Sequence, residues 1–475
     1  MRILIALAAL TVMSVGDAAQ PAAAGAGVRV PTYERVVLPN GTTLLLMPSH
    51  EVPLIAFHAV VRGGAVTDPA GKPGLNALTA GLLEKGAGSR DVFQFADAVA
   101  DVGGSFTVTP DIESVTLNGQ FLARDRALMV ELLSDALMRP RLEKQQFDDL
   151  RGRNVEFIKA AKDSSPGELA PVYGNAYLFG RHPYANPVSG SEDSLAAIEH
   201  EDVPAQYQNQ FGGDRLILAV AGDFDVAEMK QRLRKACGGW RKASAPMPAV
   251  SAAPRQSGRR VLLVDAPGSV QTYFWIGNVG VARRFAERAP LDLVNTLFGG
   301  RYTSMLNTEL RIKSGLSYGA RSRFDREQQP GAFAISSYTQ TDATAQAIDL
   351  ALETLTRLQK DGIAPDALSS AQAYILGQYP LALETAANWA GAIADLEFYG
   401  LDRGYIDQYA SQISAVDAAA TRKLIDGVYP RTDDLAMVLI GDAAKIREQV
   451  KKYGPLTQMT IQEPSFSPVA SVARK

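Results

Sequence analysis

Two apolar runs close on the same dipeptide in the two halves of the chain. The run RLILAVAGDFD ends on Gly222-Asp223, and the run LAMVLIGDAAK ends on Gly441-Asp442. The two glycines are 219 residues apart, and a short helical pattern followed by a polar turn precedes each run. A matched order of elements at so long a period favours two copies of one domain over a chance match of two strand ends.

Within each half, strand patterns mix with helix patterns and lack the regular βαβ repetition of a parallel sheet. Asn40-Gly41 lies between two apolar runs and predicts a hairpin, because both residues accept the positive φ angles of a tight turn. Apolar residues at helical spacing from Leu75 to Leu83 predict a helix that stops at Gly86. Each half is therefore expected to be an α+β layer.

The segment 243–258 is rich in Pro, Ala and Ser and has no periodicity, which predicts a linker. We expect one domain over residues 27–242, a second over residues 259–462, and a flexible tail over residues 463–475.

The first 26 residues have the pattern of a secretory signal. Arg2 precedes an apolar run from Ile3 to Met13, and small residues follow around Ala18 and Ala19. This run is too short to span a bilayer, although a short membrane anchor remains the alternative. No later segment has the 18 or more continuous apolar residues of a membrane-spanning helix. The sequence predicts an exported protein, periplasmic or secreted.

Composition narrows the class of partner. The 475 residues carry a net charge of -3 with 21% charged and 46% hydrophobic residues, which is typical of a globular protein with no basic excess for nucleic acid. The single cysteine, Cys237, has no internal disulfide partner, and we expect a buried structural thiol.

The pentapeptide GLSYG around Ser317 matches the G-x-S-x-G pattern of a serine hydrolase. Its context does not fit, because a helical pattern rather than a strand precedes it and all four histidines lie upstream. Those histidines, His50, His58, His182 and His200, are at least eight residues apart, so no two share the i, i+4 spacing of a zinc helix. For each we expect a hydrogen-bonded structural role.

The stretch DPAGKPGLNALTAGLLEKGAG resembles the pitrilysin/insulinase family of zinc peptidases. By that resemblance, the two zinc histidines of active members fall on Ala77 and Gly81, and the catalytic glutamate falls on Ala80. The third ligand would lie near Glu156. The resemblance therefore implies no metal on this chain. Positions 77, 80 and 81 share one helical face, and their small side chains leave either an open apolar hollow or a face packed against another helix.

Further similarity to the family extends in order over most of residues 30 to 445. In the second half, the family pattern L-R-x-x-x-G-L-x-Y is kept at Arg311 and Tyr318, after a Gly299-Gly300 turn. In such peptidases this pair reaches the substrate at a zinc ion held by the other half or another subunit. The alternative is structural: Arg311 would cap a helix end, and Tyr318 would be a core ring.

The resemblance implies two homologous domains, each a mostly antiparallel sheet covered by helices, as in mitochondrial processing peptidase-like folds. It also implies the non-catalytic subunit of a heterodimeric zinc endopeptidase, inactive alone, with the zinc in a partner of the same family and unfolded peptides as substrates. The alternative function is a binding or scaffold protein of the same fold without a peptidase role.

Overall fold

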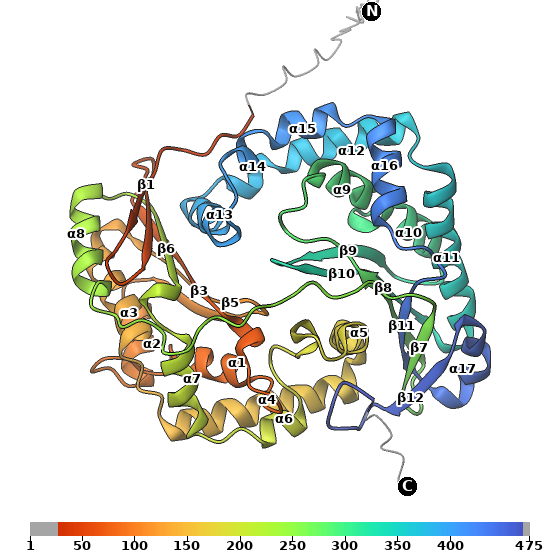
Figure 1. Cartoon of the computed structure of the whole chain (residues 1–475), viewed down its shortest axis with the longest axis horizontal. Helices are drawn as coiled ribbons and strands as arrows, with labels where there is room; N and C mark the ends of the chain where they lie inside the picture. The colour runs from red at the N-terminus through yellow and green to blue at the C-terminus, as the bar shows by residue number, and fades with distance from the viewer. Residues whose placement is uncertain (1–26, 469–475) are drawn as a thin grey trace, which may run out of the picture.

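Two six-stranded sheets organise residues 27–468, the part of the chain that the computed structural model describes (Figure 1). The strand order of the first sheet is β1-β2-β6-β3-β5-β4, and that of the second is β12-β7-β11-β8-β10-β9. The strands of the first sheet are β1 (Glu34–Val37), β2 (Thr43–Pro48), β3 (Leu54–Arg62), β4 (Ser105–Pro110), β5 (Ser114–Leu122) and β6 (Leu216–Gly222). Those of the second sheet are β7 (Arg260–Asp265), β8 (Gln271–Val279), β9 (Ala320–Arg326), β10 (Pro330–Gln340), β11 (Ala436–Gly441) and β12 (Leu456–Thr460).

Five strands of one sheet repeat five strands of the other in order and direction. β2 pairs with β6 in parallel and β7 pairs with β11 in parallel, while the next three pairs in each sheet are antiparallel. The sixth strand differs, since β1 forms a hairpin with β2 and β12 pairs in parallel with β7. This confirms the predicted fold of two homologous, mostly antiparallel sheets, and Gly222 and Gly441 end equivalent strands.

Helices connect these strands. In the first half they are α1 (Leu75–Leu82), α2 (Val92–Ala100), α3 (Arg126–Met138), α4 (Lys144–Ser164), α5 (Ala170–Phe179), α6 (Glu192–Ala196), α7 (Asp202–Gln210) and α8 (Val226–Cys237). In the second half they are α9 (Arg288–Asn295), α10 (Met305–Asn307), α11 (Thr344–Asp361), α12 (Pro365–Gln378), α13 (Ala386–Tyr399), α14 (Gly404–Asp407), α15 (Tyr409–Ala415), α16 (Ala418–Val428) and α17 (Ala443–Val450).

The two halves exchange one helix each. Helix α13 of the second half packs on β3 and β6, whereas α5 of the first half packs on β8 and β11 (Figure 1). Gly174 allows this approach in α5, since an added Cβ would lie 2.5 Å from the ring of Trp275 on β8. Both faces of β6 and β11 are thus covered, which explains why these central strands are continuous apolar runs in the sequence.

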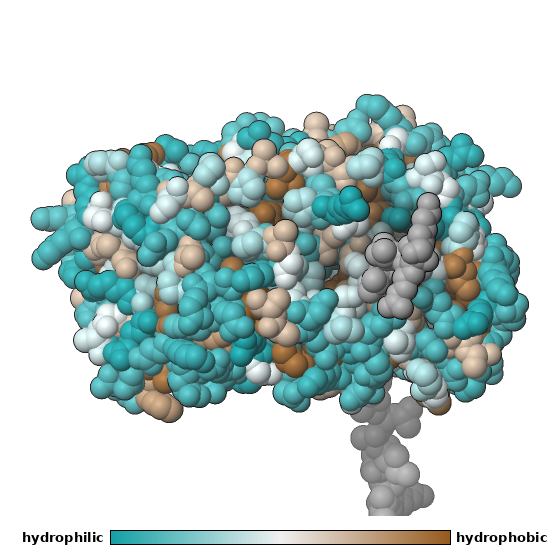
Figure 2. All heavy atoms as spheres, turned by 60° about the horizontal axis from the view of Figure 1, so that its bottom comes forward, coloured by the Kyte–Doolittle hydropathy of each residue, from teal (hydrophilic) through white to brown (hydrophobic). Residues whose placement is uncertain are grey.

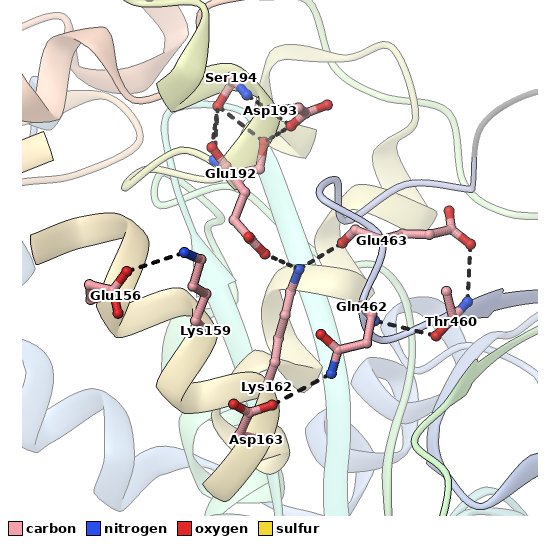
Figure 3. A network of polar contacts seen from close by, with 11 residues as sticks. Glu156, Lys159, Lys162, Asp163, Glu192, Asp193, Ser194, Thr460, Gln462 and Glu463 are labelled. Atoms are coloured by element: carbon pink, nitrogen blue, oxygen red, sulfur yellow. Dashed lines mark hydrogen bonds and ion pairs between the residues drawn. The ribbon is translucent and has the colours of Figure 1, made fainter. Parts of the chain in front are cut away.

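A buried lysine connects the segment around Glu463 to the first half (Figure 3). Lys162, on α4, pairs with Glu192 of α6, and its ammonium group donates to the carbonyl oxygen of Glu463 at 2.7 Å. Its side chain is only 2% exposed, so the two acceptors compensate a charge that is removed from water.

The tail predicted to be flexible over residues 463–475 is in part fixed. Over residues 463–468 it packs against the first half, where Phe466 is buried and its ring lies 5.0 Å from that of Tyr173. The prediction is therefore wrong for this stretch, because an aromatic side chain has an apolar site to fill. Its remainder, residues 469–475, and the predicted signal, residues 1–26, lie outside the described residues.

Strand β9 is absent from the sequence-based expectations, because ARSRFDR has the composition of a polar connection. It forms because Ala320 and Ser322 point into the protein, while Arg321 and Arg323, which alternate with them, remain exposed. Residues 243–258 contain neither helix nor strand, and the domain boundaries on either side of them remain predictions.

The face seen in Figure 2 is mainly hydrophilic, with apolar residues scattered between polar ones. Over residues 27–468, no helix combines the length and the apolar character needed to cross a membrane.

Candidate functional site

The segment between β8 and β9 leaves regular helical geometry twice. Helix α9 passes into a π-helical segment, η6 (Thr296–Gly300), and α10 passes into a second one, η7 (Thr308–Lys313). Gly299 in η6 packs so tightly on β9 that an added Cβ would lie 2.2 Å from the backbone nitrogen of Ser322. Such π-helical segments are frequent at functional sites. Gly299 and Gly300 thus end a helix and form part of a cavity wall.

Arg311, on η7, lies between two tyrosine rings. The carbon at the centre of its guanidinium group is 4.2 Å from the ring centre of Tyr318 and 4.9 Å from that of Tyr302. Tyr318 is 72% exposed, so it is not the core ring that the structural alternative requires. The structure therefore brings together the two residues singled out in the sequence and adds Tyr302, which is also exposed and which sequence reasoning missed.

Both residues of the pair line a cavity of about 840 Å³ between the two halves. The first half contributes the end of α4, the turn after it with Glu168, and the start of α5. The second half contributes residues of η6, η7, β8, β9 and β10. The cavity contains five tyrosines and three arginines: Tyr273, Tyr302, Tyr318, Tyr338, Tyr374, Arg301, Arg311 and Arg321. A volume of this size is typical of ligand sites.

The positive charge of this cavity is not neutralised from within. Among the described residues, Arg301, Arg311 and Arg321 form no ion pair with a carboxylate, and Glu168 is the one acidic residue in the lining. Arg323, two residues further along β9, pairs instead with Asp325 at 2.5 Å. The site can therefore accept an anionic or strongly polarised group.

Ser317 has the contacts of a structural residue. It is buried, its hydroxyl donates to the carbonyl oxygen of Gly319 at 2.9 Å, and it lies 2.9 Å from the hydroxyl of Ser337. In the described part of the chain no histidine bonds to it, so the elbow-like pentapeptide lacks the base that a serine nucleophile requires.

The zinc-motif positions on α1 are packed. Ala80 is fully buried and Ala77 is 7% exposed. Gly81 faces α4, where an added Cβ would lie 2.7 Å from a methyl carbon of Leu150. The structure thus decides between the two alternatives: this face packs against another helix and is not an open hollow. Its side chains offer no donor atom, so they do not fit a zinc ion.

The other side chains considered as metal ligands are paired with groups of the protein. Glu156 is exposed and pairs with Lys159 at 3.2 Å. His182 and His200 each contact a backbone carbonyl oxygen at 2.7 Å, and His50 pairs with Asp223 at 2.6 Å. Over residues 27–468, no group of three or more His, Cys, Asp or Glu side chains is arranged to hold a metal ion.

Two other titratable side chains are buried away from the cavity. His58 on β3 is mostly buried, and burial lowers its pKa despite the nearby carboxylate of Asp395. Cys237 is 1% exposed, and burial raises the pKa of its thiol to about 12, which confirms the expected structural thiol.

Like charges meet where hairpins of the two halves touch. The buried carboxylate of Glu113 accepts hydrogen bonds from the hydroxyl of Tyr184 and, at 2.8 Å, from the backbone nitrogen of Gln328. Burial, and then the carboxylates of Asp111 and Glu113, raise the pKa of Glu327 to about 8. Ionisation of Glu327 thus opposes the contact between the halves.

Two family profiles match the chain. One is described as insulinase (peptidase family M16) and matches residues 49–191, and the other is described as the peptidase M16 inactive domain and matches residues 197–375. Together these matches cover more than half of the chain.

Relatives align over most of the length. An uncharacterized zinc protease of Mycobacterium leprae is 26% identical over 84% of this chain and 89% of its own. The non-peptidase homolog YmxG of Helicobacter pylori is 21% identical over 84% of this chain and 91% of its own.

Solved structures share the fold. A peptidase M16 inactive domain from Pseudomonas fluorescens has a TM-score of 0.80 at 20% identity and covers 86% of this chain and 98% of its own. The periplasmic protease PqqL of Escherichia coli has a TM-score of 0.73 at 13% identity, over 87% of this chain and 46% of its own.

Proposed function

This chain belongs to the M16 family of peptidases, and on that premise we propose that it is the non-catalytic subunit of an exported heterodimeric zinc endopeptidase. Arg311 and Tyr318 bind an unfolded peptide and stabilise the transition state of its hydrolysis. The zinc ion belongs to a partner subunit of the same family, and this chain alone neither binds zinc tightly nor cleaves peptides.

The observation that carries this proposal is the contrast between the two motif positions. Where the family has its zinc ligands, this chain has Ala77 and Ala80, which are buried, and Gly81, which is half-buried against Leu150. Where the family has its substrate pair, Arg311 and Tyr318 are stacked on each other in an open cavity. One half of an active site is thus lost, and the other half is kept accessible.

The chemistry suits these two side chains. Peptide hydrolysis builds negative charge on the former carbonyl oxygen, and one preorganised donor at that oxygen typically contributes a factor of about 10² to 10³ in rate. The guanidinium of Arg311 keeps its charge at every working pH, and the phenol of Tyr318 is a neutral donor. The contacts with the rings of Tyr302 and Tyr318 hold the guanidinium group of Arg311 at the cavity. In the partner, zinc would polarise the carbonyl.

The test is kinetic and uses the complex of this chain with an exported family member that carries His-x-x-Glu-His. Arg311→Ala should lower kcat/KM for a fluorogenic peptide by a factor of about 10² or more. Tyr318→Phe should lower it by a factor of about 10 or more. The zinc content of the complex, measured by mass spectrometry, should not change.

Lys313→Gln is the matched control, because Lys313 is an exposed cation on the same π-helical segment and already pairs with Glu309 at 3.0 Å. Unchanged kinetics for both Arg311→Ala and Tyr318→Phe would refute their roles. Peptide cleavage by this chain alone, with stoichiometric zinc, would refute the non-catalytic assignment.

A scaffold role without peptidase function is the competing proposal, and the non-peptidase homolog name of the Helicobacter pylori relative supports it. A scaffold protein does not require Arg311 to lie between two exposed tyrosine rings in an open cavity. The complex separates the two proposals, since a scaffold predicts no dependence of cleavage on Arg311.

Export is the remaining part of the proposal. It is supported by the signal pattern in residues 1–26 and by a structural neighbour that is named as periplasmic. Fractionation of cells, followed by sequencing of the mature N-terminus, tests it: an intact Met1 in the cytoplasmic fraction would contradict export.

A further inference from the structure

We propose that the cavity around Arg311 selects peptides that carry carboxylate groups, with Arg301 and Arg321 as specificity-determining residues. This inference rests on the proposed function, because it names the class of substrate that the same cavity takes. It arises from two arginines that neither the sequence motif nor the proposed chemistry uses.

Arg321 on β9 differs from the other arginines of that strand in its charge partners. Strand β9 carries three arginines, and two of them have carboxylate partners: Arg323 with Asp325 at 2.5 Å, and Arg326 with Asp292 at 2.9 Å. Arg321 is exposed and lines the cavity, and within residues 27–468 it forms no ion pair. Its charge is therefore available to a ligand.

Arg301 holds a second charge in the lining of the same cavity. It follows η6 directly, and its guanidinium donates to the hydroxyl of Ser370 on α12 at 3.1 Å. This neutral contact fixes the side chain without neutralising it. The charge of Arg301 is therefore available to an acidic group that enters the cavity.

The remaining walls suit a peptide. Five tyrosines present flat rings and hydroxyl groups, which bind side chains and backbone amides with little loss of conformational entropy. Three arginines against one acidic residue, Glu168, give the lining an excess of positive charge, although the whole chain is negative. The excess is therefore local and favours anionic segments of a substrate.

The test is binding of dye-labelled unfolded peptides to the full chain, measured by fluorescence anisotropy with a neutral dye. One peptide carries two central Glu residues, and its partner carries Gln at the same positions. The Glu peptide should bind about tenfold more tightly at low salt, and 0.5 M NaCl should remove most of this difference. Versions with a C-terminal amide distinguish side-chain carboxylates from the terminal one.

Arg301→Gln and Arg321→Gln should each lower the affinity for the Glu peptide about threefold to tenfold. The affinity for the Gln peptide should not change. Arg323→Gln is the matched control, because Arg323 lies on the same side of the same strand and is already paired. It should change neither affinity by more than about twofold.

Equal affinities for the Glu and Gln peptides would overturn the inference, as would an equal loss in Arg323→Gln and Arg321→Gln. A single-stranded oligonucleotide that binds more tightly than the Glu peptide would assign the cavity to another class of ligand. In the complex with the zinc subunit, cleavage that depends on Arg311 but is equally fast for the Glu and Gln peptides would refute this inference and leave the proposed function intact. Loss of Arg311 dependence refutes the proposed function itself.

Discussion

The segment between β3 and β4 and the segment between β8 and β9 occupy the same place in the topology of the two sheets and differ in character. In the first half, β3 leads to the regular helices α1 and α2, and the zinc-motif face of α1 is packed against α4. In the second half, β8 leads to two π-helical segments that present exposed tyrosines and an arginine to a cavity. The same framework thus carries one closed site and one open site.

If the proposed function holds, this difference separates the features of a repeated fold that serve packing from those that serve binding. Ala77, Ala80 and Gly81 on α1 have no polar side-chain atom, and their small size allows close packing. Around Arg311, irregular backbone and exposed aromatic rings persist although they contribute little to a core.

The largest effect is expected where zinc ligands are put back on α1. Ala77→His, Ala80→Glu and Gly81→His together should lower the free energy of unfolding by about 4 kcal/mol or more, because they overpack the contact with Leu150 and bury an unpaired carboxylate. Urea unfolding and zinc analysis measure the outcome.

The matched control is Gly152→Ala on α4, where an added Cβ meets no atom within 4 Å and should stabilise the helix by about 0.5–1 kcal/mol. If the triple variant bound stoichiometric zinc and kept near wild-type stability, the zinc-motif face of α1 would not be closed, and its contrast with the cavity around Arg311 would be wrong.

A smaller loss is expected in the open site at Gly299. Gly299→Ala should cost about 3 kcal/mol, because its Cβ would lie 2.2 Å from a backbone nitrogen of β9, and backbone cannot move aside cheaply. Gly300→Ala is the control, since its added Cβ would lie 3.1 Å from its nearest neighbour, the carbonyl oxygen of Asn295. It should lower the free energy of unfolding by less than about 1 kcal/mol. Equal thermal unfolding curves for both variants would show that η6 does not require the glycine.

The contact between the hairpins of the two halves predicts a pH dependence. Because the pKa of Glu327 is raised from 4.5 to about 8 in the folded protein, its contribution to stability is fully present below pH 4.5 and is lost as pH rises towards 8. Glu327→Gln should therefore be more stable than wild type by about 1–3 kcal/mol at pH 9 and equal to it at pH 4, after allowance for the partial exposure of this side chain.

Unfolding at both pH values measures this difference, with Glu156→Gln as the exposed control that should show less than about 0.5 kcal/mol at either pH. A Glu327→Gln curve parallel to wild type from pH 4 to pH 9 would contradict the assignment.

The smallest effect is expected from Tyr302, which we regard as a positioning residue for Arg311. An exposed cation–π contact contributes about 0.5–1 kcal/mol, so Tyr302→Ala should lower kcat/KM of the complex about two- to fivefold. Tyr302→Phe keeps the ring and should restore the wild-type value. A loss in Tyr302→Phe as large as in Tyr302→Ala would point to the hydroxyl instead.

Local patterns in the sequence predicted the regular parts of the fold. The Asn40-Gly41 pair does connect β1 and β2, and the leucine pattern does form α1. Strand β9 was missed, because its exposed arginines hide the alternation that Ala320 and Ser322 provide. Tyr302 was missed because its stacking on Arg311 connects two segments that only the fold brings together.

The sequence by itself determined the repeated α+β architecture, the absence of donor atoms at positions 77, 80 and 81, and the presence of Arg311 and Tyr318 at the family spacing. These follow from side-chain chemistry and local periodicity. Only the tertiary structure decided that α1 is packed shut, that α5 and α13 cross between the halves, and that three arginines share one cavity without carboxylate partners in the described chain. Each depends on contacts between residues far apart in the sequence, which local pattern does not encode.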